Sequence, residues 1–232
     1  MKQLQILNDI AALVFPNLCL ACEQPLGTGE KMICLTCQLT LPKTNYHLHH
    51  ENPVEKHFWG RVHIEAATAL YHYIKQTRVQ HMIHQLKYKG RTDIGIHLGR
   101  LFGYQLQESD DFKNVDIITS VPLHKHKLDK RGYNQSDLLG EGLSETLQKP
   151  FDKNILVRNV FTQTQTRKSR SERWKNVDSI FSVPHPEKIS GKHILLIDDV
   201  ITTGSTLEAC ANEILKISGT KVSIAALAHA TQ

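Results

Sequence analysis

The sequence lacks a long apolar run, a repeated segment and a strong excess of one charge. The longest apolar run near its start covers residues 10–15 behind Asp9, which is shorter than a signal-peptide core and far shorter than a membrane span. We therefore predict no membrane insertion and a cytoplasmic location. The absence of repeats and low-complexity tracts also excludes solenoid architectures and flexible linkers.

The composition is that of a globular chain with a mild positive charge. Of the 232 residues, 40% are hydrophobic and 22% are charged, which is enough to bury a core and too polar for a membrane protein. The net charge is +5, and it is concentrated: residues 122–136 carry +3 and residues 158–175 carry +5. Two basic segments in an otherwise slightly acidic chain favour an anionic partner.

The order of apolar patterns predicts a parallel α/β sheet flanked by helices, preceded by a small N-terminal unit. Leucine and alanine at helical spacing predict a short helix over residues 4–14. A polar, histidine-rich stretch follows the cysteines, and we place a boundary near residue 55, which gives units 1–55 and 56–232. Beyond it, strands are predicted at 62–73, 115–121, 193–197 and 222–228, and helices at 79–86, 94–102, 139–147 and 207–217. Strands that alternate with helices call for right-handed crossovers and a parallel sheet.

The stretch from Leu195 to Thr206 predicts a site for a phosphorylated sugar. An apolar strand delivers Asp198 and Asp199 to the carboxyl end of the sheet, where ligands of open α/β folds bind. A loop of hydroxyl residues around one glycine then opens a helix, and such a loop can hold a phosphomonoester. The two carboxylates suit the vicinal hydroxyls of a sugar or a divalent cation. The simpler alternative is a helix cap, which does not require two consecutive acids at a buried strand end.

This stretch closely resembles the 5-phosphoribosyl 1-pyrophosphate (PRPP) signature of type I phosphoribosyltransferases. The resemblance implies that Asp198 and Asp199 hold the ribose hydroxyls of PRPP, which binds with Mg²⁺, and that the following loop holds its 5′-phosphate. It also implies a pyrophosphate contact from Lys127 and Arg131, and a mobile loop later in the chain. The implied loop residues are Val200, Thr202, Thr203, Gly204, Ser205 and Thr206, and the implied mobile-loop contacts are Arg158, Gln165 and Arg173.

A narrower resemblance, to ComF-type phosphoribosyltransferase-like proteins, extends over almost the whole chain from Cys19 onward. It rests on Val121 to His124, Arg131 to Gln135, Lys87 to Arg91, and the set Arg158, Thr162, Gln165, Arg173 and Asn176. One departure is Lys168 before Ser169, where the family commonly has leucine. The resemblance implies a four-cysteine zinc unit at the N-terminus and a link to DNA uptake in naturally competent bacteria.

The cysteines themselves predict a structural zinc site. Cys19, Cys22, Cys34 and Cys37 form two Cys-x-x-Cys pairs with eleven residues between the pairs, and four thiolates fill a tetrahedral coordination sphere. Two disulfides are the alternative, which a chain without an export signal disfavours. The fifth cysteine, Cys210, lies on the apolar face of a predicted helix and is read as a buried small residue.

Among the 14 histidines, His124 and His126 are interpreted as hydrogen-bond donors beside bound phosphates rather than as metal ligands. His47, His49 and His50, or His124 and His126, offer a second metal site only if a carboxylate joins them, and no acidic residue stands at a fixed spacing.

Three functions fit these features. The first is an active phosphoribosyltransferase, in which an acceptor nitrogen attacks C1 of PRPP. The second is an accessory protein of the competence machinery, whose basic segments bind single-stranded DNA. The third is a regulator that senses PRPP without catalysis. We expect PRPP and single-stranded DNA to compete if both use the basic residues. Trp174, between Arg173 and Lys175, would stack a base in a nucleic-acid site, and a loop anchor is the alternative.

Overall fold

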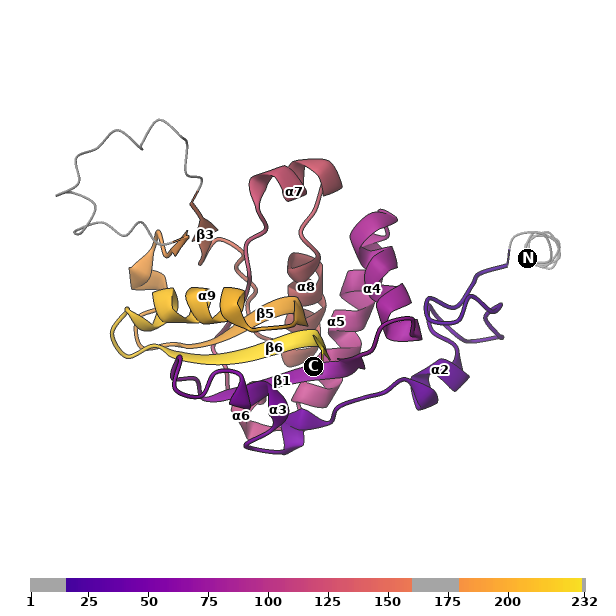
Figure 1. The fold of residues 1–232 in the computed structure, drawn as a ribbon, viewed down its shortest axis with the longest axis horizontal. Coiled ribbons are helices and arrows are strands. Elements are labelled where there is room, and N and C mark those ends of the chain that lie inside the picture. Colours follow the sequence, from indigo (N-terminus) through magenta and orange to yellow (C-terminus); the bar gives the residue numbers. More distant parts are fainter. Residues whose placement is uncertain (1–15, 160–179, 231–232) are drawn as a thin grey trace.

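The computed structural model describes residues 16–159 and 180–230, and these form a parallel sheet with helices on both faces (Figure 1). The sheet has the order β1-β6-β5-β2 and every neighbouring pair is parallel. Its strands are β1 (Ala66–Tyr73), β2 (Ile117–Ser120), β5 (His193–Ile201) and β6 (Lys221–Ala230). The predicted parallel α/β architecture is confirmed. The helix predicted over residues 4–14 lies outside the described residues.

The two central strands are apolar along their length because helices cover both faces of the sheet. In β5, residues 194–197 are fully buried, and in β6 residues 222–229 are buried. Two predicted strand limits were wrong by four residues, and those of β2 and β6 were wrong by one or two. β1 begins at Ala66 rather than at residue 62, and β5 continues past residue 197 to Ile201, so the acidic pair lies inside the strand.

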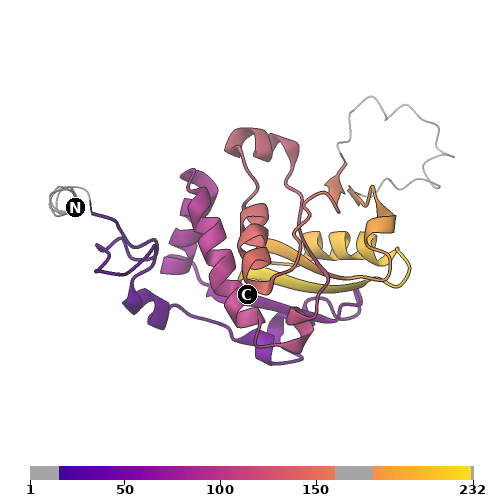
Figure 2. The same cartoon turned by 180° about the vertical axis from the view of Figure 1, so that it is seen from behind.

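Three long helices pack on one face of the sheet and one helix packs on the other (Figure 2). The first group is α4 (Arg78–Tyr88), α5 (Thr92–Leu106) and α8 (Gln135–Leu147), and the helix on the opposite face is α9 (Ser205–Leu215). Each of the four helices was predicted, with ends that differ by a few residues. The shorter elements are α2 (Leu35–Thr40), η1 (Tyr46–Leu48), α3 (Pro53–Lys56), α6 (Asp110–Lys113), α7 (Lys125–Arg131), the antiparallel pair β3 (Val157–Arg158) and β4 (Phe181–Ser182), and η3 (Pro186–Lys188).

The N-terminal segment is attached to the sheet through α4 and the edge of β1. Leu20 and Ile33 are buried in the same apolar cluster as Met82 of α4. Gln85 of α4 donates a side-chain hydrogen bond to the Leu20 carbonyl, at 3.3 Å. Farther along, the backbone of residues 42–44 hydrogen-bonds to the outer edge of β1. The unit boundary near residue 55 stays a prediction.

Glycine lets α5 and α8 approach closely, and this contact fixes the position of α8. A Cβ atom added at Gly142 would lie 2.1 Å from the Ile96 carbonyl oxygen, and one added at Gly99 would lie 2.3 Å from the Leu139 carbonyl oxygen. Both neighbours are backbone atoms, which cannot rotate away as a side chain can. The two helices would have to separate to admit any side chain at these positions.

Gly142→Ala is therefore expected to destabilise the protein by about 2 kcal/mol, although alanine is the better helix former by about 1 kcal/mol. Urea unfolding of both forms measures the change. Glu141→Ala, one residue earlier and exposed on the same helix, is the control and is expected to change stability by less than about 0.5 kcal/mol. A Gly142→Ala protein as stable as the unmodified chain would contradict the close packing.

Candidate functional site

The acidic pair lies in the second half of β5, beyond the end of the neighbouring strand β2. The β2 pairing ends at Ser120 opposite Ile197, whereas Asp198 still pairs with Ala226 of β6. Ser136, in the first turn of α8, donates a hydrogen bond to Asp198 Oδ1 at 3.1 Å. The backbone N–H of Asp199 donates to the same oxygen at 2.8 Å. The carboxyl end of the sheet thus presents two adjacent carboxylates, one of them held by α8.

The pKa of Asp198 is raised to about 7, first by burial and then by the charge of the adjacent Asp199. The hydrogen bonds from Asp199 N–H and Ser136 and the charge of Lys87 act in the opposite direction. Near neutral pH this carboxyl group is therefore close to the midpoint of its titration. A cation brought to the pair by a ligand would favour its charged form.

Lys87 forms an ion pair with Asp199. It comes from the last turn of α4, and its Nζ lies 2.8 Å from Asp199 Oδ2. Both side chains are mostly buried, with 24% and 14% exposed, so the ion pair is shielded from solvent. Lys87 belongs to the stretch of residues 87–91 used for the ComF resemblance, but the sequence assigned it no role.

The predicted phosphate loop begins at the end of β5 and runs into the N-terminus of α9. Gly204 has a φ of 73°, a left-handed conformation that suits glycine, and a Cβ there would meet the ring of Phe58 at 3.2 Å. The Thr203 and Ser205 hydroxyl oxygens are 3.1 Å apart. Asp198 and residues 200–207 line a small cavity of about 40 Å³. Short hydroxyl side chains and a helix N-terminus at one cavity are features of a phosphate site.

Arg61 also reaches this loop, and nothing in its sequence surroundings pointed to it. Its guanidinium donates to the Thr203 carbonyl oxygen at 3.0 Å and to the Ser205 hydroxyl at 3.4 Å. It also pairs with Glu208 in the first turn of α9. The loop is thus braced by a residue from the segment that follows α3.

Lys127 and Arg131 lie on α7, which follows β2 and was not predicted as a helix. They line a hollow of about 440 Å³, here called the basic hollow, whose remaining walls are Lys87, Tyr88, Gly90, Lys130 and Tyr133. The Arg131 guanidinium lies 5.5 Å from the centre of the Tyr88 ring. The Tyr133 hydroxyl donates to the Leu86 carbonyl at 2.6 Å, which ties the end of α7 to α4. Because Lys87 also contacts Asp199, the basic hollow adjoins the acidic pair.

The predicted mobile-loop residues fall in two groups. Arg158 lies in β3, with its guanidinium 5.4 Å from the Phe181 ring of β4. Gln165 and Arg173 lie outside the described residues, as do Lys168 and Trp174.

His124 caps α7 by accepting a hydrogen bond from the His126 N–H, and the two imidazole rings stack with centroids 5.6 Å apart.

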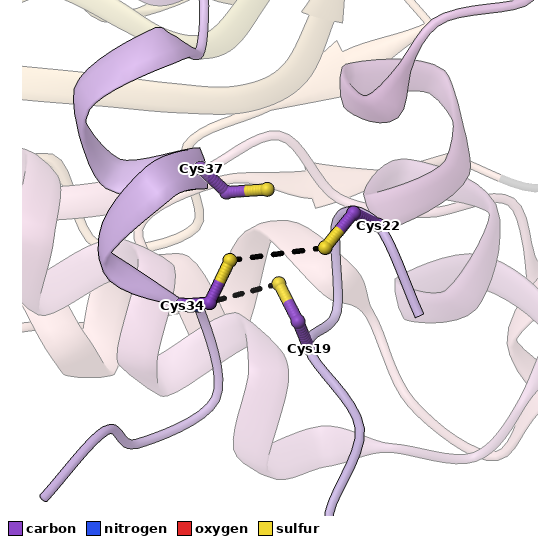
Figure 3. A group of neighbouring side chains, drawn as sticks. All are labelled: Cys19, Cys22, Cys34 and Cys37. Atoms are coloured by element: carbon purple, nitrogen blue, oxygen red, sulfur yellow. Dashed lines mark hydrogen bonds between the residues drawn. The ribbon is translucent and has the colours of Figure 1, made fainter. Parts of the chain in front are cut away.

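The four N-terminal cysteines converge on one point (Figure 3). Their sulfur atoms all lie within 4.8 Å of one another, and the Cys22 and Cys34 sulfurs are 3.7 Å apart. A tetrahedral Zn²⁺ with Zn–S bonds of about 2.3 Å places its ligand sulfurs ~3.8 Å apart, so this donor set fits zinc. No disulfide joins these cysteines, which are all free thiols.

The thiols of the cluster differ in how readily they ionise. Burial opposes ionisation of Cys19, but N–H groups of Cys34, Ala21 and Cys22 lower its pKa to about 7. The pKa of Cys37 is raised by burial and by the neighbouring thiols. Cys210 is different: it is fully buried in α9 and burial raises its pKa well above the usual value, as expected of a small core residue.

Among the described residues, no helix combines the length and the apolar character that a bilayer crossing requires.

Sequence comparisons relate this chain to known proteins. The phosphoribosyl transferase domain model matches residues 141–232. DNA utilization protein YhgH of Escherichia coli (strain K12) is 32% identical over 228 residues, which cover 91% of this chain and 96% of the relative. Competence protein F of Haemophilus influenzae is 28% identical over 223 residues with the same coverage.

Among solved structures, the glutamine PRPP amidotransferase from B. subtilis aligns with a TM-score of 0.45 and 21% identity, over 62% of this chain. The aligned part is 30% of the amidotransferase chain. The relatives that cover nearly the whole chain and the domain model together establish the family and the fold. This chain belongs to the ComF family and has a type I phosphoribosyltransferase fold with an N-terminal cysteine cluster.

Proposed function

We propose that the protein binds PRPP with Mg²⁺ and acts in DNA uptake or DNA utilization. The observation that carries the first half is the carboxyl end of β5, where Asp198 and Asp199 are followed at once by the hydroxyl and glycine loop of α9. Two carboxylates and a phosphate loop within one turn match the two ends of a ribose 5-phosphate group.

Each part of PRPP has residues suited to it. Asp198 and Asp199 hold the ribose hydroxyls, and residues 202–206 hold the 5′-phosphate. Lys127 and Arg131 of the basic hollow, with Lys87, offset the charge of the pyrophosphate. When bound, Mg²⁺ neutralises part of the pyrophosphate charge. The cysteine cluster holds a Zn²⁺ whose role is structural, because four thiolates leave no open position for a substrate.

Transfer of the phosphoribosyl group to an acceptor nitrogen is the second candidate. The observation in its favour is the group of four cations at the basic hollow, which suits a leaving pyrophosphate as its negative charge grows. A sensor that binds PRPP without turnover would use the same residues. Release of pyrophosphate separates the two, since only the transferase liberates it.

The second half of the proposal rests on the names of the relatives and on the same basic surface. Tyr88 is 64% exposed beside Arg131, so an aromatic face and a cation are available to a nucleotide base and a phosphate. Single-stranded nucleic acid is bound by this combination of stacking and charge. Because the basic hollow also adjoins the acidic pair, PRPP and single-stranded DNA are expected to compete for it.

The test is a calorimetric titration with PRPP and Mg²⁺, followed by single-stranded DNA on the free and the PRPP-loaded protein. We expect PRPP to bind, and DNA affinity to fall steeply with salt and to drop by about tenfold when PRPP is present. Arg131→Gln should weaken both ligands. Arg100→Gln, which removes an exposed cation paired with Glu145 on α5 and α8, should weaken neither.

The PRPP-binding part and the DNA-binding part of the proposal can be contradicted independently. Absence of PRPP binding would overturn the ligand assignment, whether or not single-stranded DNA binds. Binding of both ligands with no mutual effect would leave the PRPP site standing and would move the DNA contact away from the basic hollow.

A further inference from the structure

Both terminal nitrogens of Arg61 donate two hydrogen bonds each around the phosphate loop. Nη1 donates to the His57 carbonyl and to the Thr203 carbonyl, each at 3.0 Å. Nη2 donates to the Ser205 hydroxyl and to Glu208. Each of these nitrogens carries two N–H donors, so all four donors are engaged. The guanidinium therefore joins the end of α3, the loop and the first turn of α9.

Arg61 supplies a positive charge that the phosphate loop itself lacks. Residues 200–207 contain no cationic side chain, and Glu208 puts a negative charge in the first turn of the helix on which an incoming phosphate would rest. A carboxylate so close to a bound dianion repels it, and this opposes the attraction of the helix N-terminus. Arg61 pairs with that carboxylate and adds a positive charge at the same place.

The segment that carries Arg61 also contacts the loop through Phe58 and the sheet through His57. The Phe58 ring lies against Gly204, and His57 Nε2 is 2.9 Å from His229 Nε2 at the end of β6. The phosphoribosyl transferase domain model matches only residues 141–232, so this brace comes from a part of the chain outside that match. The brace is thus an addition to the strand, loop and helix that carry the phosphate signature.

We propose that Arg61 is a positioning residue of the phosphate loop: it orients the Thr203 carbonyl and cancels the charge of Glu208, so that the loop accepts a phosphomonoester. This inference rests on the proposed PRPP site and names a residue on which its 5′-phosphate end depends. Arg61 acts mainly through Glu208 and the loop backbone, so its effect should disappear when the Glu208 charge is removed.

The experiment is a calorimetric titration of the full chain with ribose 5-phosphate, which probes the loop, and with pyrophosphate, which probes the basic hollow. Arg61→Gln is expected to weaken ribose 5-phosphate by about tenfold and to leave pyrophosphate within about twofold. Glu208→Gln should strengthen ribose 5-phosphate, and the double variant should regain most of the affinity that Arg61→Gln loses. Arg100→Gln, another exposed arginine paired with a glutamate, is the matched control.

The outcomes are separable from those of the proposed function. If the unmodified chain binds neither PRPP nor ribose 5-phosphate, the proposed function falls, and the inference falls with it. If the unmodified chain binds and Arg61→Gln binds equally well, only the role of Arg61 is wrong. A loss that is equal for both probes, or that Glu208→Gln does not relieve, marks a general structural effect and also overturns the positioning role.

Discussion

Asp198→Asn is expected to make the protein more stable and to abolish its affinity for PRPP. Burial and the adjacent Asp199 raise the pKa of Asp198 to about 7 in the folded state, whereas an unfolded chain titrates this group near its ordinary value of 3.8. The ionised side chain is therefore unfavourable in the fold. An amide of the same size removes that cost, on the order of 4 kcal/mol above neutral pH, and also removes the charge that the proposed contacts with the ribose hydroxyls and Mg²⁺ require.

The sign of the pH dependence follows from the same shift. Between about pH 4 and about pH 7, the folded protein binds a proton at Asp198 that the unfolded chain does not bind. Stability contributed by this group therefore rises as the pH falls through that window and is lowest above it. In Asp198→Asn the contribution should vanish, which thermal unfolding at several pH values measures.

Two controls separate the effects on stability and on binding. Thr203→Val should weaken PRPP without stabilising the fold, because the Thr203 side chain is exposed and carries no charge. Asp110→Asn should change neither property, because that carboxyl is exposed at α6, where it pairs with Lys113. An Asp198→Asn protein that is less stable at about pH 8, or that still binds PRPP as the unmodified chain does, would contradict the argument.

The residues of the acidic pair and its loop could be predicted because they are contiguous in the sequence. One strand, one turn and one helix N-terminus supply Asp198, Asp199 and residues 202–206, so local pattern is enough. The four cysteines are similar, since each pair is separated by two residues and the pairs by eleven. Neither prediction needed knowledge of long-range packing.

The partners of these residues could not be predicted, because only the fold brings them near. Ser136 is 62 positions from Asp198, and Arg61 is 142 positions from Thr203. A single lysine, serine or arginine in a surface-like stretch has no pattern that distinguishes it from solvated residues. Lys87 stood in a stretch noted for its family resemblance, yet its contact with Asp199 depends on how α4 lies against β5.

The helix and the strand end that were not predicted also lack a local apolar pattern. α7 has no buried residue, so it lacks the apolar spacing by which α4, α5 and α8 were predicted. The extension of β5 to Ile201 was missed because two carboxylates interrupt its apolar run. That interruption coincides with the candidate site, where we propose that ligand chemistry and not core packing sets the residue types.

Removal of zinc is expected to disorder residues 19–41 and to leave the sheet folded. This segment contributes few buried apolar side chains of its own, chiefly Leu20, Ile33 and Leu41. Structural zinc sites contribute on the order of 10 kcal/mol of binding free energy to folding, which exceeds what so small an apolar contact supplies. Metal analysis should find one zinc per chain, and a chelator should release it together with hydrogen-exchange protection in this segment.

The loss of hydrogen-exchange protection should extend to α4 but should not reach the acidic pair. Glu23 pairs with His81 at 3.0 Å, and Gln85 donates to the Leu20 carbonyl, so the outer side of α4 loses partners when the cluster opens. Lys87, two residues after Gln85, should keep its contact with Asp199, because that contact does not involve the N-terminal segment. PRPP affinity should therefore fall by no more than about threefold after chelation, while the stability of the N-terminal segment collapses.

Single substitutions locate the effect at the cluster. Cys37→Ser should lower the zinc content and reproduce the chelator result, because Cys37 is buried among the other three sulfurs. Cys210→Ala, the matched change at the remaining cysteine, should leave zinc content untouched and cost only packing free energy in α9. A zinc-free protein whose residues 19–41 stay protected would show that apolar contact with α4 alone is enough to hold this segment, and a structural role for the metal would be excluded.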